Sequence, residues 1–250
     1  MGNKVLVIGD VCNDVYIYGK CVRFCPDAPV PVFIPLDRTE NGGMAANVQR
    51  NIASLGVECD IISNQEYIEK KRYVDTKTNH MFLRVDSNEE KIDRVHAHQL
   101  KNLQSYDAVV VSDYNKGFLT ERDVELICKS HNLVFLDTKK KLGKWCAESC
   151  FIKINEVEYN NSKGFIEKNK ILLEEKLVVT LSNNGCRYMN KQYNVAPVNI
   201  KDSSGAGDTF LAGLVVEYLK TRDIEPALQY ANFCATKVVQ QKGVTEVGEL

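Results

Sequence analysis

Short apolar runs alternate with helical segments along most of the chain, and this alternation limits its fold more than any other feature. Most of the runs are continuous rather than alternating in polarity, as expected for strands that helices cover on both faces. They lie at residues 5–11, 31–36, 59–63, 108–112, 133–137, 151–154 and 177–181. The pattern therefore predicts an α/β fold built on a mainly parallel sheet.

Helix boundaries are marked between these runs. A helical segment over residues 45–55 stops at Gly56, a residue typical of helix C-termini. Thr120, followed three positions later by Asp123, resembles a capping box for a helix that extends through residue 129. Helical periodicity also predicts two long helices near the end of the chain, at residues 208–220 and 226–241.

Residues 64–94 interrupt the rhythm, because they contain few large apolar runs. Short β-like pieces at 72–74 and 81–85, together with 16–18 and 30–34, predict a small second sheet. No linker divides the sequence into independent parts. We therefore expect a single domain over residues 1–250, with a lid of strands drawn from about 15–36 and 71–86.

Charge and cysteine usage exclude several classes of protein. The 32 basic and 33 acidic residues nearly cancel, so no overall field attracts nucleic acid or an acidic membrane. No apolar run approaches the ~20 residues that a membrane-spanning helix needs. The nine cysteines form no C-x-x-C pair, which favours reduced thiols. We expect a cytoplasmic protein that binds neither nucleic acid nor membranes.

The strongest local signal is D-S-S-G-A-G-D at residues 202–208, directly before an apolar helix. Glycines at a helix start let the backbone approach a ligand, and the free N–H groups there favour an anion such as phosphate. Asp208 would lie beside that phosphate, where a carboxylate suits a general base acting on an attacking hydroxyl. A Gly-rich cap with an N-terminal Asp explains this segment equally well.

Three weaker signals also lie at the ends of strands or the starts of helices. Gly42 and Gly43 precede a helix that contains Asn47, and this set suits either a polyol site or a tight loop. Asp14 follows the first strand and could accept hydrogen bonds from sugar hydroxyls or simply form a turn. Neither G-x-x-x-x-G-K-[ST] nor G-x-G-x-x-G occurs, so P-loop and Rossmann interpretations lose their main support.

Asn155 and Glu158 follow the strand predicted at 151–154. A carboxylate and an amide at this position could hold the water shell of Mg²⁺, which binds few protein groups directly. On spacing alone, a helix cap is the simpler interpretation.

Taken together, these segments resemble the ribokinase (PfkB) family of carbohydrate kinases. The family signature D-x-x-G-A-G-D matches residues 202–208, with Ser where Thr is common. Its paired glycines with a following Asn match Gly42, Gly43 and Asn47, and its N-x-x-E motif matches Asn155 and Glu158. The resemblance implies a ribokinase-like α/β fold with a small β-sheet lid, and ATP-dependent phosphorylation of a sugar hydroxyl.

The resemblance also implies roles for individual residues. Asp208 would be the base, and the backbone of Gly205, Ala206 and Gly207 would form the anion hole. Asn155 and Glu158 would organise Mg²⁺. The implied nucleotide side is Thr180, Ser182, Gly185 and Asn232, and the implied sugar side is Asp14, Gly42, Gly43 and Asn47. A homodimer through the lid sheet is a further implication.

Several segments are similar to the kinase domain of the bacterial heptose-7-phosphate kinases, above all A-P-V-P-V at residues 28–32. Residues 9–16, 83–86 and 112–117 add to this likeness. It implies transfer to the anomeric hydroxyl of a sugar that already carries a phosphate. Lys116, Arg72 and Arg84 are the candidate cations for that second phosphate, with Lys116 first among them.

One departure from the family puts the substrate in question. Between residues 61–63 and 71–73 the family normally carries a strand–helix–strand excursion, on the order of 30 residues, that this chain lacks. We expect a less covered sheet edge and a remodelled sugar side. The alternatives are a kinase for another sugar, sugar phosphate or nucleoside, and a non-catalytic relative that only binds sugar or nucleotide.

Overall fold

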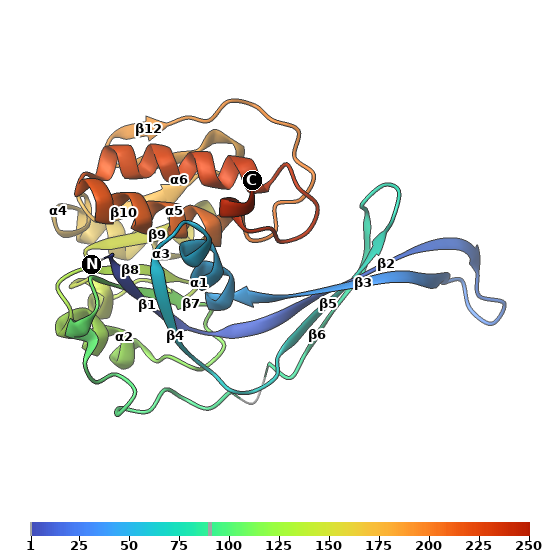
Figure 1. Ribbon diagram of the computed structural model, residues 1–250, viewed down its shortest axis with the longest axis horizontal. Helices are drawn as coiled ribbons and strands as arrows, with labels where there is room; N and C mark the ends of the chain where they lie inside the picture. The colour runs from blue at the N-terminus through green and yellow to red at the C-terminus, as the bar shows by residue number, and fades with distance from the viewer. Residues whose placement is uncertain (1, 90–91) are drawn as a thin grey trace.

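The larger of two sheets forms the body of the protein in a computed structural model that describes residues 2–89 and 92–250 (Figure 1). Its strand order is β12-β11-β10-β9-β8-β7-β1-β4. The neighbouring strands β4, β1, β7, β8, β9 and β10 are parallel to one another, while β11 and β12 pair in antiparallel fashion. Their bounds are β1 Lys4–Gly9, β4 Glu58–Ser63, β7 Ala108–Asp113, β8 Val134–Thr138, β9 Phe151–Asn155, β10 Leu177–Thr180, β11 Cys186–Tyr188 and β12 Lys191–Tyr193.

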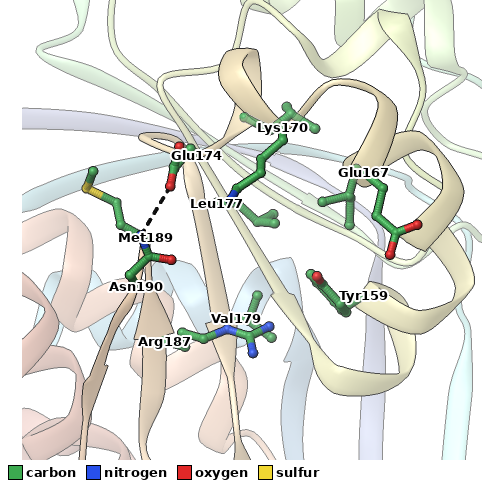
Figure 2. A pocket seen from close by; sticks show the side chains of 11 residues that line it. Tyr159, Glu167, Lys170, Glu174, Leu177, Val179, Arg187, Met189 and Asn190 are labelled. Carbon is green, nitrogen blue, oxygen red and sulfur yellow. Dashed lines mark hydrogen bonds between the residues drawn. The ribbon is translucent and has the colours of Figure 1, made fainter.

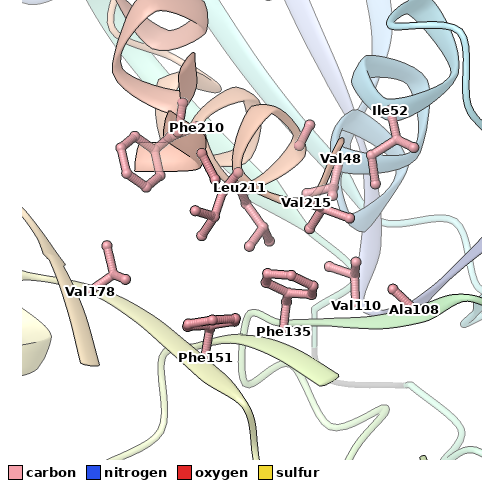
Figure 3. Close-up of a cluster of buried hydrophobic side chains, with 14 of the residues drawn as sticks. Val48, Ile52, Ala108, Val110, Phe135, Phe151, Val178, Phe210, Leu211 and Val215 are labelled. Atoms are coloured by element: carbon pink, nitrogen blue, oxygen red, sulfur yellow. The ribbon is translucent and has the colours of Figure 1, made fainter. Parts of the chain in front are cut away.

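Helices cover both faces of this sheet, which confirms the predicted α/β layers. Val5 and Val7 of β1 pack under one group of helices, while Leu6 and Ile8 face the other group. Figure 3 shows part of the first cluster, with the ring of Phe135 at its centre. The first group is α1 Ala45–Ser54, α5 Ala206–Thr221 and α6 Ile224–Val238, and the second is α2 Glu121–Ser130, α3 Glu156–Lys168 and α4 Lys170–Leu173. Short 3-10 turns occupy Leu103–Ser105, Lys144–Cys146, Ser182–Asn184 and Val247–Glu249.

The predicted helix boundaries hold to within a few residues. Thr120 Oγ1 accepts from Asp123 N, and Asp123 Oδ2 accepts from Thr120 N, which completes the capping box. Gly56, just past α1, has a φ of +84°, a left-handed value that favours glycine. Within the described ranges, no helix combines the length and the apolar character needed to cross a membrane.

The smaller sheet projects from one side of the body as a lid (Figure 1). Its order is β3-β2-β5-β6, with strands Val11–Phe24, Pro31–Met44, Glu69–Asp75 and Met81–Ser87 for β2, β3, β5 and β6. These strands are longer than the sequence pattern indicates, because β3 continues past its apolar residues 31–36 through the mostly polar residues 37–42. The strand predicted at 5–11 is in fact divided, since β1 ends at Gly9 and β2 begins at Val11.

A short link over residues 64–68 joins β4 to β5, where the sequence predicts the loss of an excursion. The Asn64 side chain fixes this link, because Oδ1 accepts from Val11 N at 2.7 Å and Nδ2 donates to Val11 O at 3.3 Å. At the sheet edge, Lys4 pairs with Glu58 and Asp60 of β4 at 2.7 and 3.0 Å. Charged side chains of this kind discourage pairing with another strand.

Phe135 offers a direct test of the core. Its ring is fully buried and lies 5.3 Å from the Phe151 ring and 5.7 Å from the Tyr218 ring, centroid to centroid. Phe135→Ala should lower the free energy of unfolding by about 3–5 kcal/mol, because it leaves a cavity. Leu126→Ala, at a half-exposed position of α2, should cost no more than about 0.5 kcal/mol. Urea denaturation measures both; equal losses would contradict this assignment of the core.

Candidate active site

The Asp208 carboxylate joins three segments that are far apart in the sequence. It lies in the first turn of α5 and is 4% exposed. Asn47 of α1 donates from Nδ2 to Asp208 Oδ2 at 3.0 Å. The Tyr114 hydroxyl, in the loop after β7, donates to Asp208 Oδ1 at 2.5 Å. Both carboxylate oxygens are therefore held in place by neutral donors.

Burial controls the proton affinity of this carboxylate. It raises the pKa of Asp208 to about 6, while the hydrogen bonds from Tyr114 and Asn47 act in the opposite direction. The pKa of Tyr114 is raised well above 10, first by burial and then by the charge of Asp208. Near neutral pH, Tyr114 therefore stays protonated and donates, while Asp208 is ionised but basic enough to accept a proton.

A second buried acid, Asp10, holds the loop that carries Tyr114. Its Oδ2 accepts from Tyr114 N at 2.7 Å and from Lys116 N at 3.4 Å, and Oδ1 accepts from Phe118 N at 3.3 Å. Burial, and then repulsion from Asp113, raise the pKa of Asp10 above its ordinary value. The division between β1 and β2 thus places a carboxylate where it anchors this loop.

The predicted glycine segment forms the start of α5. Gly205 has a φ of +77°, and a Cβ there would lie 2.7 Å from Asn47 Nδ2, so a side chain would disturb the amide that binds Asp208. The Ala206 N–H donates to Ser203 O at 3.3 Å. The N–H groups of Gly205 and Gly207 have no acceptor among the described residues, which leaves two donors at this helix end.

Three adjoining cavities form the cleft, and Asp208 lines two of them, the lid-side and the central one. A lid-side cavity of about 370 Å³ lies under the smaller sheet, and a central cavity of about 400 Å³ shares Tyr114, Lys139, Gly205 and Asp208 with it. A helix-side cavity of about 440 Å³ shares Thr180, Ser182 and Gly207 with the central one. The shared residues make a continuous cleft with the Asp208 carboxylate in its middle.

On the lid side, the predicted residues divide into lining and supporting groups. Asp14 and Asn47 line the cavity, and Arg72 Nη1 pairs with Asp14 Oδ1 at 2.6 Å. Gly42 and Gly43 are not among its lining residues. A Cβ at Gly43 would lie 2.1 Å from Asp14 Oδ2, so this glycine makes room for the carboxylate.

The three candidate phosphate-binding cations, Arg72, Arg84 and Lys116, all line the lid-side cavity. Each is already paired with a carboxylate. Arg72 is paired with Asp14 as described, Lys116 Nζ lies 2.5 Å from Glu89 Oε2, and Arg84 Nε lies 2.7 Å from Asp86 Oδ1.

All four residues predicted for the nucleotide side line the helix-side cavity, namely Thr180, Ser182, Gly185 and Asn232. Gly185 has a φ of +79°, and its missing Cβ would lie 2.0 Å from Tyr193 O. Asn232 Nδ2 donates to that same carbonyl at 2.8 Å. The glycine and the amide therefore hold β12 close against the loop after β10.

Asn155 and Glu158 form a capping box at the start of α3. Asn155 Oδ1 accepts from Glu158 N at 2.9 Å, and Glu158 Oε2 accepts from Asn155 N at 2.8 Å. The other oxygen of Glu158 accepts from Asn155 Nδ2 and pairs with Lys139. Both oxygens of Glu158 are thus engaged within the protein.

Several polar residues in and beside the cleft were not predicted from the sequence. Tyr114, Lys139, Lys153 and Lys70 line the cleft. Asp137, 2% exposed, lies behind it, and its Oδ2 pairs with Lys153 Nζ at 2.7 Å. Among the residues described, Asp137 Oδ1 is a buried oxygen without a hydrogen-bond partner. A signal was present for Lys153, because it is a charged residue inside the otherwise apolar run 151–154.

A separate cavity of about 360 Å³ lies between α3, α4 and the strands β10 and β11 (Figure 2). Its lining includes Tyr159 and Arg187, whose guanidinium carbon lies 5.1 Å from the centroid of the Tyr159 ring. Among the described residues that line this cavity, none is a predicted site residue.

Residues 61–249 match the sequence model of the pfkB family of carbohydrate kinases. This chain belongs to that family. It is therefore a carbohydrate kinase, a phosphotransferase with an alcohol group as acceptor.

Curated relatives of this kinase include bifunctional protein HldE from a Nitratiruptor species, 31% identical over 291 residues, and from Helicobacter pylori, 32% identical over 295 residues. These alignments cover 97% and 96% of the chain, which spans 63% of the length of each relative. Since the first alignment has 291 positions and the chain 250 residues, at least 41 positions have no counterpart here. A deletion relative to these proteins is consistent with the short link between β4 and β5.

Solved structures confirm the ribokinase-like fold. The kinase matches Arabidopsis thaliana ribokinase, solved with ribose and ATP, with a TM-score of 0.73 at 13% identity, covering 100% of this chain and 96% of that one. Thermotoga maritima ribokinase gives a TM-score of 0.71 at 16% identity, with coverage of 98% and 95%.

Removing the Tyr114 hydroxyl tests the electrostatics of the site. Its hydrogen bond lowers the pKa of Asp208, so Tyr114→Phe should raise that pKa above the wild-type value of about 6. Carboxyl-carbon NMR titration measures the change directly. Tyr106→Phe is the matched control, because that hydroxyl donates to Asp60 at 2.8 Å, outside the cleft. An unchanged or lower pKa of Asp208 in Tyr114→Phe would refute the assigned interaction.

Proposed function

We propose that this kinase transfers the γ-phosphoryl group of ATP to the anomeric hydroxyl of a sugar phosphate that resembles a heptose 7-phosphate. The observation that carries the proposal is the buried Asp208 carboxylate, which lies at a glycine-rich helix start between a cation-lined cavity and a second cavity. Such a position suits a base that meets a hydroxyl on one side and a phosphoryl donor on the other.

Asp208 is the general base in this mechanism. As the sugar oxygen forms its bond to the γ-phosphorus, its proton passes to Asp208, and the bond from that phosphorus to the β-bridging oxygen breaks to release ADP. The backbone N–H groups of Gly205, Ala206 and Gly207 stabilise the transferring group. Gly205 and Gly207 contribute most, because Ala206 N–H is shared with Ser203.

Two lysines supply positive charge to the cleft. Lys139 lines both the lid-side and the central cavity, and Lys153 lines the central one. Burial alone would lower the pKa of Lys139, but the charges of Asp137 and Glu158 outweigh it, so the pKa is raised. A permanently charged ammonium at this junction balances the negative charge of the phosphoryl group in transfer.

Nucleotide binding is assigned to the helix-side cavity, with Thr180, Ser182, Gly185 and Asn232 as its contacts. A cavity of about 440 Å³ is of the size that small-molecule sites have. The matching Arabidopsis thaliana ribokinase was solved with ATP and ribose, which supports two substrates in one cleft.

Mg²⁺ is expected to accompany ATP and to neutralise its phosphate charge. Asn155 and Glu156 line the central cavity, and Glu158 lies just behind them in the capping box of α3. Asn155 and Glu158 would hold it through water, since the oxygens of Glu158 already accept protein hydrogen bonds. Asp137 Oδ1, which lacks a hydrogen-bond partner among the described residues and lies 4.0 Å from Lys139 Nζ, adds negative charge beside this site.

The sugar-phosphate assignment is supported by the HldE relatives and by the cations of the lid-side cavity, including Lys116, Arg72 and Arg84. The short link over residues 64–68 motivates two alternative functions. One is a kinase for another sugar, sugar phosphate or nucleoside, and the other is a non-catalytic relative that only binds sugar or nucleotide. A panel of sugars, sugar phosphates and nucleosides decides between them by ATP consumption. Thermal stabilisation by nucleotide without turnover of any acceptor would favour the non-catalytic alternative.

A homodimer through the lid sheet is part of the same proposal. Apolar side chains that a partner would cover are exposed on the lid strands, among them Val22, Phe24, Leu83 and Val85. Sedimentation measures the oligomeric state. The cytoplasmic location expected from the sequence stays a prediction.

Asp208→Asn tests the assigned base. Loss of the proton acceptor should lower kcat about 10²- to 10⁴-fold, while the fold and nucleotide binding persist. Asp60→Asn, outside the cleft, should leave kcat unchanged. If Asp208→Asn turns over sugar phosphate at the wild-type rate, Asp208 is not the general base.

The pH dependence follows from the raised pKa of Asp208. Only the ionised carboxylate accepts a proton, so kcat/KM should fall as pH drops through about 6 and level off above it. This limb should be absent from the residual activity of Asp208→Asn. A rate that stays flat from about pH 5 to about pH 8, a range that contains the expected midpoint, would be incompatible with this role.

A further inference from the structure

The lid-side cavity is strongly cationic. Five basic side chains line it, against the two carboxylates Asp14 and Asp208; the five are Lys70, Arg72, Arg84, Lys116 and Lys139. Four of the five are paired with an acid, in the pairs Arg72–Asp14, Arg84–Asp86, Lys116–Glu89 and Lys139–Glu158. The fifth, Lys70, stands apart from this pattern.

Lys70 is 7% exposed, yet its ammonium lacks an anionic partner within the described part of the chain. It lies on β5, where its strand neighbours in register are Asp14 of β2 and Asp86 of β6. Across residues 2–89 and 92–250, no ion pair or hydrogen bond engages Nζ, and Lys70 lines the lid-side cavity. An ammonium in a largely enclosed cavity gains from an anionic ligand that compensates its lost hydration.

The position of Lys70 connects it with the reacting end of the cleft. Its Nζ lies 5.5 Å from the centroid of the Tyr114 ring, and the hydroxyl of that ring is bonded to Asp208. The aromatic contact compensates only part of the cost of burial. A ligand in the lid-side cavity would therefore meet the base through one group and the unpaired ammonium through another.

We propose that Lys70 binds the phosphate group that the sugar carries before the reaction, and so selects phosphorylated over unphosphorylated acceptors. This rests on the proposed function, because it takes a sugar phosphate as the substrate. An ammonium offers a point charge and three donors, which suits a phosphate. Arg72, Arg84 and Lys116 would each have to share or leave a carboxylate to do the same, whereas Lys70 has no carboxylate partner to give up among the residues that the structure describes.

Binding measured without ATP tests this role separately from catalysis. Titration calorimetry would compare heptose 7-phosphate with unphosphorylated heptose on the wild type and on Lys70→Met. Loss of one charged contact should weaken binding of heptose 7-phosphate by roughly 10- to 100-fold and leave binding of heptose within about threefold. Lys70→Arg, which keeps the charge, should recover part of the affinity.

Lys71→Met is the matched control, because Lys71 is the next residue of the same strand and pairs with Glu69 at 2.7 Å, outside the cavity lining. It should bind both ligands as the wild type does. If Lys70→Met binds heptose 7-phosphate as tightly as the wild type, the proposal is overturned. An equal loss for both sugars also overturns it, since that result indicates a structural role.

Inorganic phosphate separates this proposal from the proposed function. If the wild type binds phosphate and Lys70→Met binds it at least tenfold more weakly, Lys70 is an anion site whichever sugar is turned over. If the two bind phosphate equally, Lys70 is not that site, even where heptose 7-phosphate is phosphorylated. Failure of the wild type to phosphorylate any sugar phosphate would count against the proposed function alone.

Discussion

The hydrogen bonds on the Asp208 carboxylate join α5, α1 and the loop after β7 at one buried point. Asn47 reaches it from α1, directly after the long lid strand β3, and Tyr114 reaches it from the loop that Asp10 anchors. The approach of α5 to α1 is close enough that Gly205 has no room for a side chain. The position of the lid strand β3 and the start of α5 therefore both depend on the buried Asp208 carboxylate.

Charge pairing within the cleft follows a consistent pattern. Asp208 is held by the neutral donors Tyr114 and Asn47, whereas Asp137 pairs with Lys153 and Asp14 with Arg72. Most basic residues of the lid-side cavity are oriented by carboxylates, which keeps the cavity wall ordered before a ligand arrives. Pre-organised charge is what phosphoryl transfer needs, because little covalent chemistry is left for the protein to do.

Much of this structure could be predicted from the sequence. Apolar runs and caps located the strands and helices of the body, and the glycine motifs located the start of α5 and the loop after β10. The extent of the lid could not be predicted, since backbone pairing rather than apolar periodicity extends β2 and β3. Tyr114, Lys139, Lys70 and Asp137 were missed because the chemistry of each depends on partners distant in sequence, which only the folded chain brings together.

The central claim is that this cleft phosphorylates the anomeric oxygen of a sugar phosphate. ³¹P NMR of the purified chain with ATP, Mg²⁺ and heptose 7-phosphate tests it most directly, because it distinguishes the position of the new phosphate. We expect loss of the ATP signals and a new phosphate resonance coupled to the anomeric proton, with the original phosphate ester retained. ATP that stays intact, or a new ester at any other hydroxyl, would contradict it.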